Sequence, residues 1–162
     1  MSGLAEELGV EGEAILFAAA RADHVERIIR PALAAGRWVL CDRFADSTRA
    51  YQGATGGADE GLLSALDRVA VGRTIPDLTV ILDVPVEVGL ARAAQRLAAG
   101  GEALDRFERD DRVMQELRRQ AFLRIAEREP ERCIVIDASE PEGAVGEAVW
   151  QAVRARLLDE AA

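Results

Sequence analysis

Lysine is absent from this sequence, because all 20 basic residues among its 162 are arginine. A reaction that depends on a lysine side chain is therefore excluded for these residues. Arginine can still serve a phosphate site, since its planar guanidinium donates two parallel hydrogen bonds to phosphate oxygens. Whether these arginines do so depends on their positions.

Cysteine and long apolar runs are also scarce. The two cysteines, Cys41 and Cys133, each lie in a short apolar run, which favours free core thiols over a disulfide or a metal site. A helix that crosses a bilayer needs about 18 apolar residues, and no apolar run in this sequence is nearly that long. The N-terminus also lacks the basic residues followed by an apolar run that are typical of a signal peptide. We therefore predict a cytoplasmic protein with no membrane partner.

An excess of positive charge is absent as well. The formal net charge of -9 argues against nucleic acid or an anionic membrane as the main partner. A site for a negatively charged ligand must therefore be built locally, from a few well-placed arginines.

Short apolar runs and longer helical patterns alternate along the chain. Runs that end in an acidic residue predict buried strands at residues 38–42, 78–83 and 133–137. Helical patterns cover residues 12–35, 59–71, 85–99, 110–129 and 141–160, with a glycine-rich loop at 53–57. This alternation predicts an α/β fold with a parallel sheet flanked by helices, in one domain over residues 1–162.

The predicted sheet is thin. Three strands are fewer than the about five that a doubly wound sheet usually has. Residues 1–11 carry no strand pattern, although α/β nucleotide-binding folds open with a strand, a glycine-rich loop and a helix. We therefore expect a domain that lacks this N-terminal strand, loop and helix.

The residues after the first predicted strand carry the strongest chemical signal. In an open parallel sheet the ligand crevice lies beyond the carboxyl ends of the strands, which puts Asp42 and Arg43 at its mouth. A carboxylate there can hold a magnesium-bound water, and the arginine can clamp a phosphate. An acidic cap on the following helix gives the same pattern, so both interpretations stay open on these two residues alone.

A second signal lies upstream, where Phe17 and Arg21 are four residues apart on a predicted helix. Both side chains therefore project from one face. A flat ring for stacking and a two-pronged donor are what the recognition of a pyrimidine needs. An isolated phenylalanine on an alanine-rich helix is more often a core residue, and that alternative also stays open.

The longer string around Arg43 favours a binding site. It resembles the signature of the bacterial thymidylate kinase family and reads Asp42-Arg43-Phe44, then Ser47-Thr48, then Ala50-Tyr51-Gln52-Gly53. The resemblance implies a P-loop nucleoside-monophosphate-kinase fold and a homodimer. It implies transfer of the γ-phosphoryl group of ATP to dTMP with Mg²⁺, giving dTDP and ADP in the synthesis of dTTP.

The resemblance also implies roles for single residues. Arg43 would be a catalytic residue that faces the phosphate groups, and Asp42 would hold the metal ion indirectly, through water. The residues implied in dTMP binding are Phe17, Arg21, Arg43, Thr48, Tyr51 and Gln52.

Residues 82–85, the helix after them and residues 104–108 resemble the segments around the mobile lid of the family. The resemblance implies a lid at about residues 92–107, of the subtype whose lid arginines close over ATP. Arg96 would be the second catalytic residue, and Arg92 and Arg106 would help to bind ATP. Residues 97–103 depart from the shorter family version, and their two adjacent glycines are compatible with a hinge.

The sequence lacks the phosphate-binding loop of such kinases, Gly-x-x-x-x-Gly-Lys-Ser/Thr, whose amides, lysine and hydroxyl hold the phosphates and magnesium. We therefore expect this chain alone to transfer phosphate weakly or not at all. Three hypotheses remain: a thymidylate kinase whose N-terminal part is missing from this sequence, a non-catalytic dTMP-binding module, and a dimerising remnant. Other small kinases of the superfamily are a minor alternative, because their base-pocket strings differ.

Overall fold

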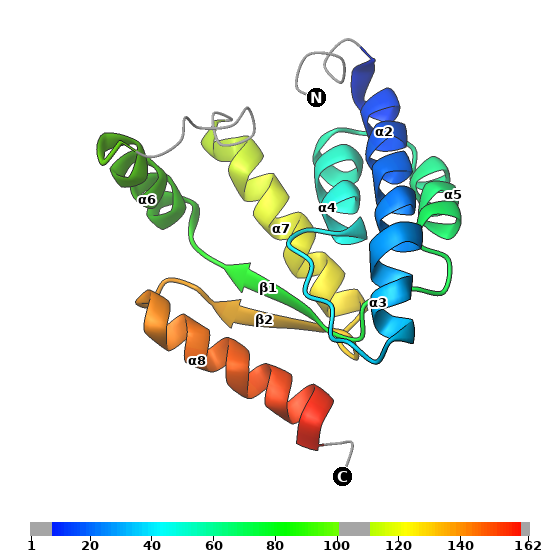
Figure 1. The fold of residues 1–162 in the computed structure, drawn as a ribbon. Coiled ribbons are helices and arrows are strands. Elements are labelled where there is room, and N and C mark those ends of the chain that lie inside the picture. Colours follow the sequence, from blue (N-terminus) through cyan, green and yellow to red (C-terminus); the bar gives the residue numbers. More distant parts are fainter. Residues whose placement is uncertain (1–7, 101–110, 160–162) are drawn as a thin grey trace. The chain divides into compact units, whose positions relative to one another are not determined.

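A computed structural model describes residues 8–100 and 111–159 of the chain. The chain divides into two compact units, Met1–Ile75 and Pro76–Ala162. Figure 1 labels the helices and strands of both units. The α/β class expected from the sequence is confirmed, since helices accompany a parallel sheet. The assignment of one domain to residues 1–162 stays a prediction.

The N-terminal unit is helical in its described residues. Its first three elements follow one another without a break, and the fourth and fifth are likewise continuous. They are α2 (Gly9–His24), the π-helical η1 (Val25–Ile29), α3 (Arg30–Ala34), α4 (Ala45–Thr48), the π-helical η2 (Arg49–Thr55) and α5 (Glu60–Ala70). The side chain of Asp59 caps α5 by accepting a hydrogen bond of 2.8 Å from the amide of Leu62.

Two details of this unit correct the sequence predictions. Residues 38–42 are not a buried strand: they have no strand pairing in the described chain, Trp38 is 68% exposed and Leu40 is fully exposed. An apolar run shows a preference for burial, but a strand needs a hydrogen-bonded partner, and residues 38–42 pair with no strand among the described residues. The predicted loop at 53–57 is also partly wrong, because η2 continues to Thr55.

The C-terminal unit holds the sheet. Its elements are β1 (Thr79–Asp83), α6 (Val86–Ala98), α7 (Arg112–Arg128), β2 (Cys133–Asp137), α8 (Glu142–Val153) and the π-helical η3 (Arg154–Leu158). The two strands are parallel, with Thr79 opposite Cys133 and Asp83 opposite Asp137. Figure 1 shows α7 and α8 on opposite sides of the sheet.

The core of the C-terminal unit lies between the sheet and α7. Ile81 and Cys133 from the strands pack against Ile125 and Ala126 of α7, and Phe122 covers this cluster. Cys133 is buried, which agrees with the core position expected for it.

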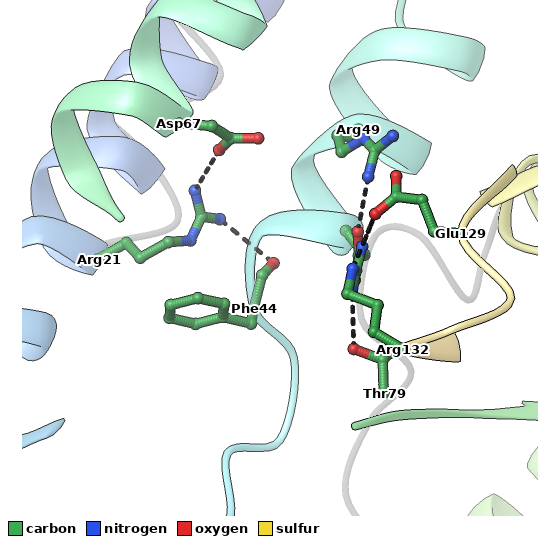
Figure 2. A network of polar contacts seen from close by, with 8 residues as sticks. Arg21, Phe44, Arg49, Asp67, Thr79, Glu129 and Arg132 are labelled. Carbon is green, nitrogen blue, oxygen red and sulfur yellow. Dashed lines mark hydrogen bonds and ion pairs between the residues drawn. The ribbon is translucent and has the colours of Figure 1, made fainter. Parts of the chain in front are cut away.

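Polar contacts fix the amino ends of both strands. The Arg132 guanidinium donates to Thr79 Oγ1 at 2.7 Å and to Glu129 Oε2 at 2.7 Å, so the residue before β2 is tied to the first residue of β1 (Figure 2). Because the two strands are parallel and in this register, their carboxyl ends, Asp83 and Asp137, lie at the same edge of the sheet.

In the N-terminal unit, two glycines allow η2 to approach its neighbours closely. A Cβ atom at Gly53 would lie 2.8 Å from Leu63 Cδ1 of α5. A Cβ atom at Gly56, just after η2, would lie 2.5 Å from Val10 Cγ2 of α2 and 2.7 Å from the carbonyl oxygen of Gln52. The carbonyl oxygen of Gln52 belongs to the backbone, which can move away only at a high cost in free energy. Small residues are therefore required where this helix packs.

We expect Gly56→Ala to lower the free energy of unfolding by about 1 to 3 kcal/mol, because the added methyl group overpacks this contact. Gly146→Ala is the matched control, since Gly146 lies in α8 and a Cβ atom there meets nothing within 4 Å. The control should raise stability by up to about 1 kcal/mol through helix propensity. Urea denaturation of both variants measures the difference, and a Gly56→Ala protein as stable as the parent would contradict the packing account.

Candidate functional site

Arg43 lies at the bend between the extended residues 37–42 and α4, and its backbone is unusual. Its φ of 63° makes it the one positive-φ residue other than glycine among the described residues. A left-handed conformation costs a non-glycine residue about 1 to 3 kcal/mol, and such strain collects at functional sites. The neighbouring Asp42 is exposed, as Arg43 is.

The Arg43 side chain turns toward Tyr51. Its Nη2 donates to Tyr51 Oη at 3.0 Å, and its guanidinium carbon lies 4.9 Å from the centre of the tyrosine ring. Tyr51 lies on η2, eight residues further along the chain. The structure thus brings together two of the residues that the sequence assigned to dTMP binding.

Arg21 of α2 is the most enclosed arginine of the proposed site. Its Nη2 donates to Thr48 Oγ1 at 2.6 Å and to the carbonyl oxygen of Phe44 at 3.3 Å. Its Nη1 lies 3.5 Å from Asp67 Oδ1, and its side chain is 9% exposed. Figure 2 shows the guanidinium between Asp67 and Phe44. Arg21 and Thr48, a second pair predicted from the sequence, are therefore in direct contact.

The environment of Arg21 leaves one donor available. Burial lowers the pKa of its guanidinium, while Asp67 and then Asp46 act in the opposite direction. Nη1 is buried and has no hydrogen-bond partner in the described part of the chain, since its contact with Asp67 is an ion pair without hydrogen-bond geometry. A buried donor without an acceptor is costly, so an oxygen from a ligand would be stabilised at this atom.

Gln52, another predicted binding residue, is 2% exposed and donates from Nε2 to Glu13 Oε2 at 2.9 Å. Glu13 itself is 6% exposed. Sequence reasoning missed Glu13, although its position was a usable signal. Glu13 precedes Phe17 by four residues, as Phe17 precedes Arg21, so the three side chains share one face of the helix.

Phe17 is 43% exposed, so it is not a core residue of the described structure. It lies on α2 between Glu13 and Arg21, the two residues that reach across to α4 and η2. An exposed aromatic ring flanked by two polar contacts can stack against a flat ligand.

The lid arginines lie in the C-terminal unit. Arg92 on α6 donates to the carbonyl oxygens of Ala138 at 2.5 Å, Ser139 at 2.7 Å and Glu140 at 3.2 Å. It thus holds the turn that follows β2. Arg96 is exposed in the last turn of the same helix. Arg106 lies outside the described residues.

The carboxyl end of β1 carries an ion pair with two hydrogen bonds. Arg119 of α7 binds Asp83 through both ends of its guanidinium, with Nε and Nη2 at 2.7 and 2.8 Å from the two carboxylate oxygens. These hydrogen bonds hold the pKa of Asp83 below its ordinary value of 3.8 and raise the pKa of Arg119. At the end of β2, the backbone amide of Ser139 lowers the pKa of Asp137.

Among residues 8–100 and 111–159, no three His, Cys, Asp or Glu side chains are grouped as a metal site would require. Asp42 is a single exposed carboxylate, which fits a magnesium ion held mainly by water and substrate phosphates, as Mg²⁺ prefers. In the same described ranges, no helix is both long and apolar enough to cross a bilayer.

We expect Asp83→Asn to reduce stability at pH 7 by about 1 to 3 kcal/mol, because Arg119 loses its charged partner. The pKa of Asp83 is lowered on folding, so its contribution is present above the unfolded value of 3.8 and is lost as the pH falls through the folded value. The parent should therefore lose more stability than the variant below about pH 4. Thermal melts across this range test the difference.

Glu140→Gln removes an exposed carboxylate of the same unit and controls for the change in net charge. Its melting temperature should follow that of the parent at each pH. If Asp83→Asn did the same, the ion pair with Arg119 would contribute nothing to the stability of this unit.

Comparisons with known proteins agree with one another. The family model described as Thymidylate kinase matches residues 3–149. The chain is 56% identical over 153 residues to the thymidylate kinase of Rhodopseudomonas palustris, covering 94% of this chain and 66% of that protein. It is 54% identical over 158 residues to the thymidylate kinase of Nitrobacter hamburgensis, covering 98% of this chain and 68% of that protein.

A solved structure matches as well. The crystal structure of thymidylate kinase from Ehrlichia chaffeensis aligns with a TM-score of 0.70 at 29% sequence identity, covering 94% of this chain and 69% of that chain. The present chain spans about two thirds of the length of the curated relatives it matches.

Proposed function

This chain belongs to the thymidylate kinase family, and from that premise we propose that it binds dTMP as the acceptor of the γ-phosphoryl group of ATP. The products of this reaction are dTDP and ADP. The proposal places the dTMP site in the N-terminal unit, on α2, α4, η2 and the bend at Arg43.

The observation that carries the proposal is the buried Nη1 of Arg21, which lacks a hydrogen-bond acceptor in the described residues. A pyrimidine carbonyl oxygen is the acceptor that fits, because a stacking ring, Phe17, lies one helical turn away on the same face. Thr48 receives the other end of the guanidinium and so sets its orientation. These residues bind and orient the base.

In this proposal, Arg43 binds the phosphate group of dTMP. Its side chain is exposed, and Tyr51 steadies it from one side, so a two-pronged contact with phosphate oxygens remains open to it. Magnesium, when bound, would supply positive charge to the transferring phosphoryl group. Asp42, beside Arg43, would hold that ion through water.

The lid assignment, at about residues 92–107 with Arg96 as the catalytic arginine, is part of the proposal. Arg96 is an exposed cation in the last turn of α6, and exposure is what a contact with the phosphates of ATP would require. Arg92 has a different part, because its guanidinium holds the turn at residues 138–140. Arg106 keeps its predicted role as a helper in ATP binding.

Transfer by these 162 residues alone should be slow. They contain no lysine and no Gly-x-x-x-x-Gly-Lys-Ser/Thr loop to hold the phosphates of ATP. A second candidate function for these residues taken by themselves is a dTMP-binding module without efficient catalysis. A homodimer and a cytoplasmic location complete the proposal; large apolar side chains exposed on α2 to α3, including Ile15, Leu16, Ile28 and Leu33, support the dimer.

Calorimetric titration with dTMP, and a separate assay for dTDP in the presence of ATP and Mg²⁺, test the proposal. We expect dTMP to bind and dTDP to form barely faster than in a control without protein. No binding of dTMP would overturn the proposed site. Rapid formation of dTDP would overturn the claim of slow transfer and leave the site in place.

Variants at Arg43 test its role in phosphate binding. We expect Arg43→Gly and Arg43→Ala to weaken dTMP binding by about tenfold or more, because a charged hydrogen bond is lost, and to leave the binding of thymidine, which has no phosphate, unchanged. Arg43→Gly should be the more stable variant by about 1 kcal/mol, since glycine adopts the left-handed conformation without strain.

The control for these variants is Arg27→Ala, which removes an arginine whose side chain is 79% exposed on η1. It should bind dTMP like the parent. Equal weakening of dTMP and thymidine by the Arg43 variants would show that Arg43 supports the pocket rather than the phosphate.

A further inference from the structure

Two polar contacts join α2 to the helix formed by α4 and η2. In one, Glu13 meets Gln52 at 2.9 Å, and in the other, Arg21 meets Thr48 at 2.6 Å. We call these two contacts the polar rungs. Glu13 and Arg21 are about two helical turns apart on α2, with Phe17 midway between them. Thr48 and Gln52 are about one turn apart, so their side chains also share a face.

The two rungs donate in opposite directions. In the contact between Gln52 and Glu13, the donor is Gln52 of η2, whereas in the contact between Arg21 and Thr48 the donor is Arg21 of α2. A carboxylate offers only acceptors, so the Gln52 amide must present its Nε2 to Glu13. Its Oε1 is therefore held on the other side of the amide group, as an acceptor.

Burial makes this orientation firm. Glu13 is 6% exposed and Gln52 is 2% exposed, so water does not compete for either group. Turning the amide over would place Oε1 against the carboxylate, which leaves two buried acceptors facing each other and one buried donor unused. That arrangement is costly in a low-dielectric interior.

We propose that Glu13 is a positioning residue that makes the pocket selective for thymine over cytosine by fixing the amide of Gln52. This inference rests on the proposed dTMP site. Thymine carries a donor at N3, between two carbonyl acceptors, whereas N3 of cytosine is an acceptor beside an amino group. An amide held with its acceptor toward the base bonds to the first pattern and opposes the second.

The chemistry at the other rung agrees with this choice. Arg21 offers only donors, and its buried Nη1 requires an acceptor. A thymine ring stacked on Phe17 supplies a carbonyl oxygen to Arg21 and an N–H group to Gln52. Cytosine in the same position would place its amino group, a donor, where Arg21 needs an acceptor. Alternatively, its N3, which carries no hydrogen, would face the Oε1 of Gln52, and two acceptors would then oppose each other.

The test compares the affinities for dTMP and dCMP in the full chain and in Glu13→Gln. A glutamine at position 13 can turn its own amide over and so pair with either orientation of Gln52. We expect the ratio of dTMP to dCMP affinity to fall by about tenfold or more. Glu11→Gln, an exposed substitution on the same helix, is the matched control and should keep the parental ratio.

A double-variant cycle separates positioning from simple support of the fold. If Glu13 acts through Gln52, then Glu13→Gln should change the ratio in the parent but not in a Gln52→Ala background. A parental ratio in Glu13→Gln, with Gln52→Ala altered, would overturn the inference while leaving the proposed function intact. Failure of the parent to bind dTMP would instead overturn the proposed function.

A measurement on the unmodified chain covers the case in which Glu13→Gln does not fold. The N3-methyl derivative of dTMP lacks the N3 donor and should bind about tenfold or more weakly than dTMP. Equal binding of the two nucleotides would show that no acceptor faces N3 and would overturn the inference.

Discussion

The proposed site depends on the close contact between α2 and the helix of α4 and η2. Gly56 allows that contact, because a Cβ atom there would strike Val10 of α2 and the carbonyl oxygen of Gln52, and Gly53 in turn allows η2 to approach Leu63 of α5. Once the two helices approach this closely, the polar groups between them leave water and must bond to each other. The two polar rungs satisfy this requirement, and Phe17 lies midway between them along α2.

Backbone strain distinguishes Arg43, and contacts with acidic and carbonyl groups hold the arginines of the C-terminal unit. Arg43 keeps a left-handed backbone although glycine would adopt it freely, which indicates that its side chain is needed there. In the C-terminal unit, Arg119 and Arg92 are both committed to the protein, one to Asp83 and the other to the carbonyl groups after β2. An arginine that is conspicuous in a sequence can therefore organise a site without touching a ligand.

Much of the fold follows from sequence periodicity. The helices at 9–34, 60–70, 86–98, 112–128 and 142–158 and the strands at 79–83 and 133–137 were predictable, because each carries a complete local pattern. The helix of α4 and η2 was not predicted. The strand predicted at 38–42 is not formed in the described structure, because pairing depends on a neighbouring strand that a local pattern does not reveal. The helical continuation through Gly53 was hidden by glycines that serve close packing rather than a turn.

The candidate site was predictable in part. The signature string named Arg43, Thr48, Tyr51 and Gln52, and the helical spacing upstream named Phe17 and Arg21. The structure joins four of these residues in two direct contacts. Asp67 and Arg119 could not be found in the same way, since each is defined by a partner far away in the sequence. The spacing of Glu13 from Phe17 indicated its helix face but not its partner, Gln52. Long-range pairing is what the three-dimensional structure adds.

A crystal structure of this chain with dTMP tests the central claim most directly. The account predicts a pyrimidine ring stacked on Phe17 between the polar rungs, with a base carbonyl oxygen at Arg21 Nη1 and the phosphate group at Arg43. A nucleotide bound elsewhere, or a ring turned away from Phe17 with Arg21 Nη1 still lacking an acceptor, would contradict it.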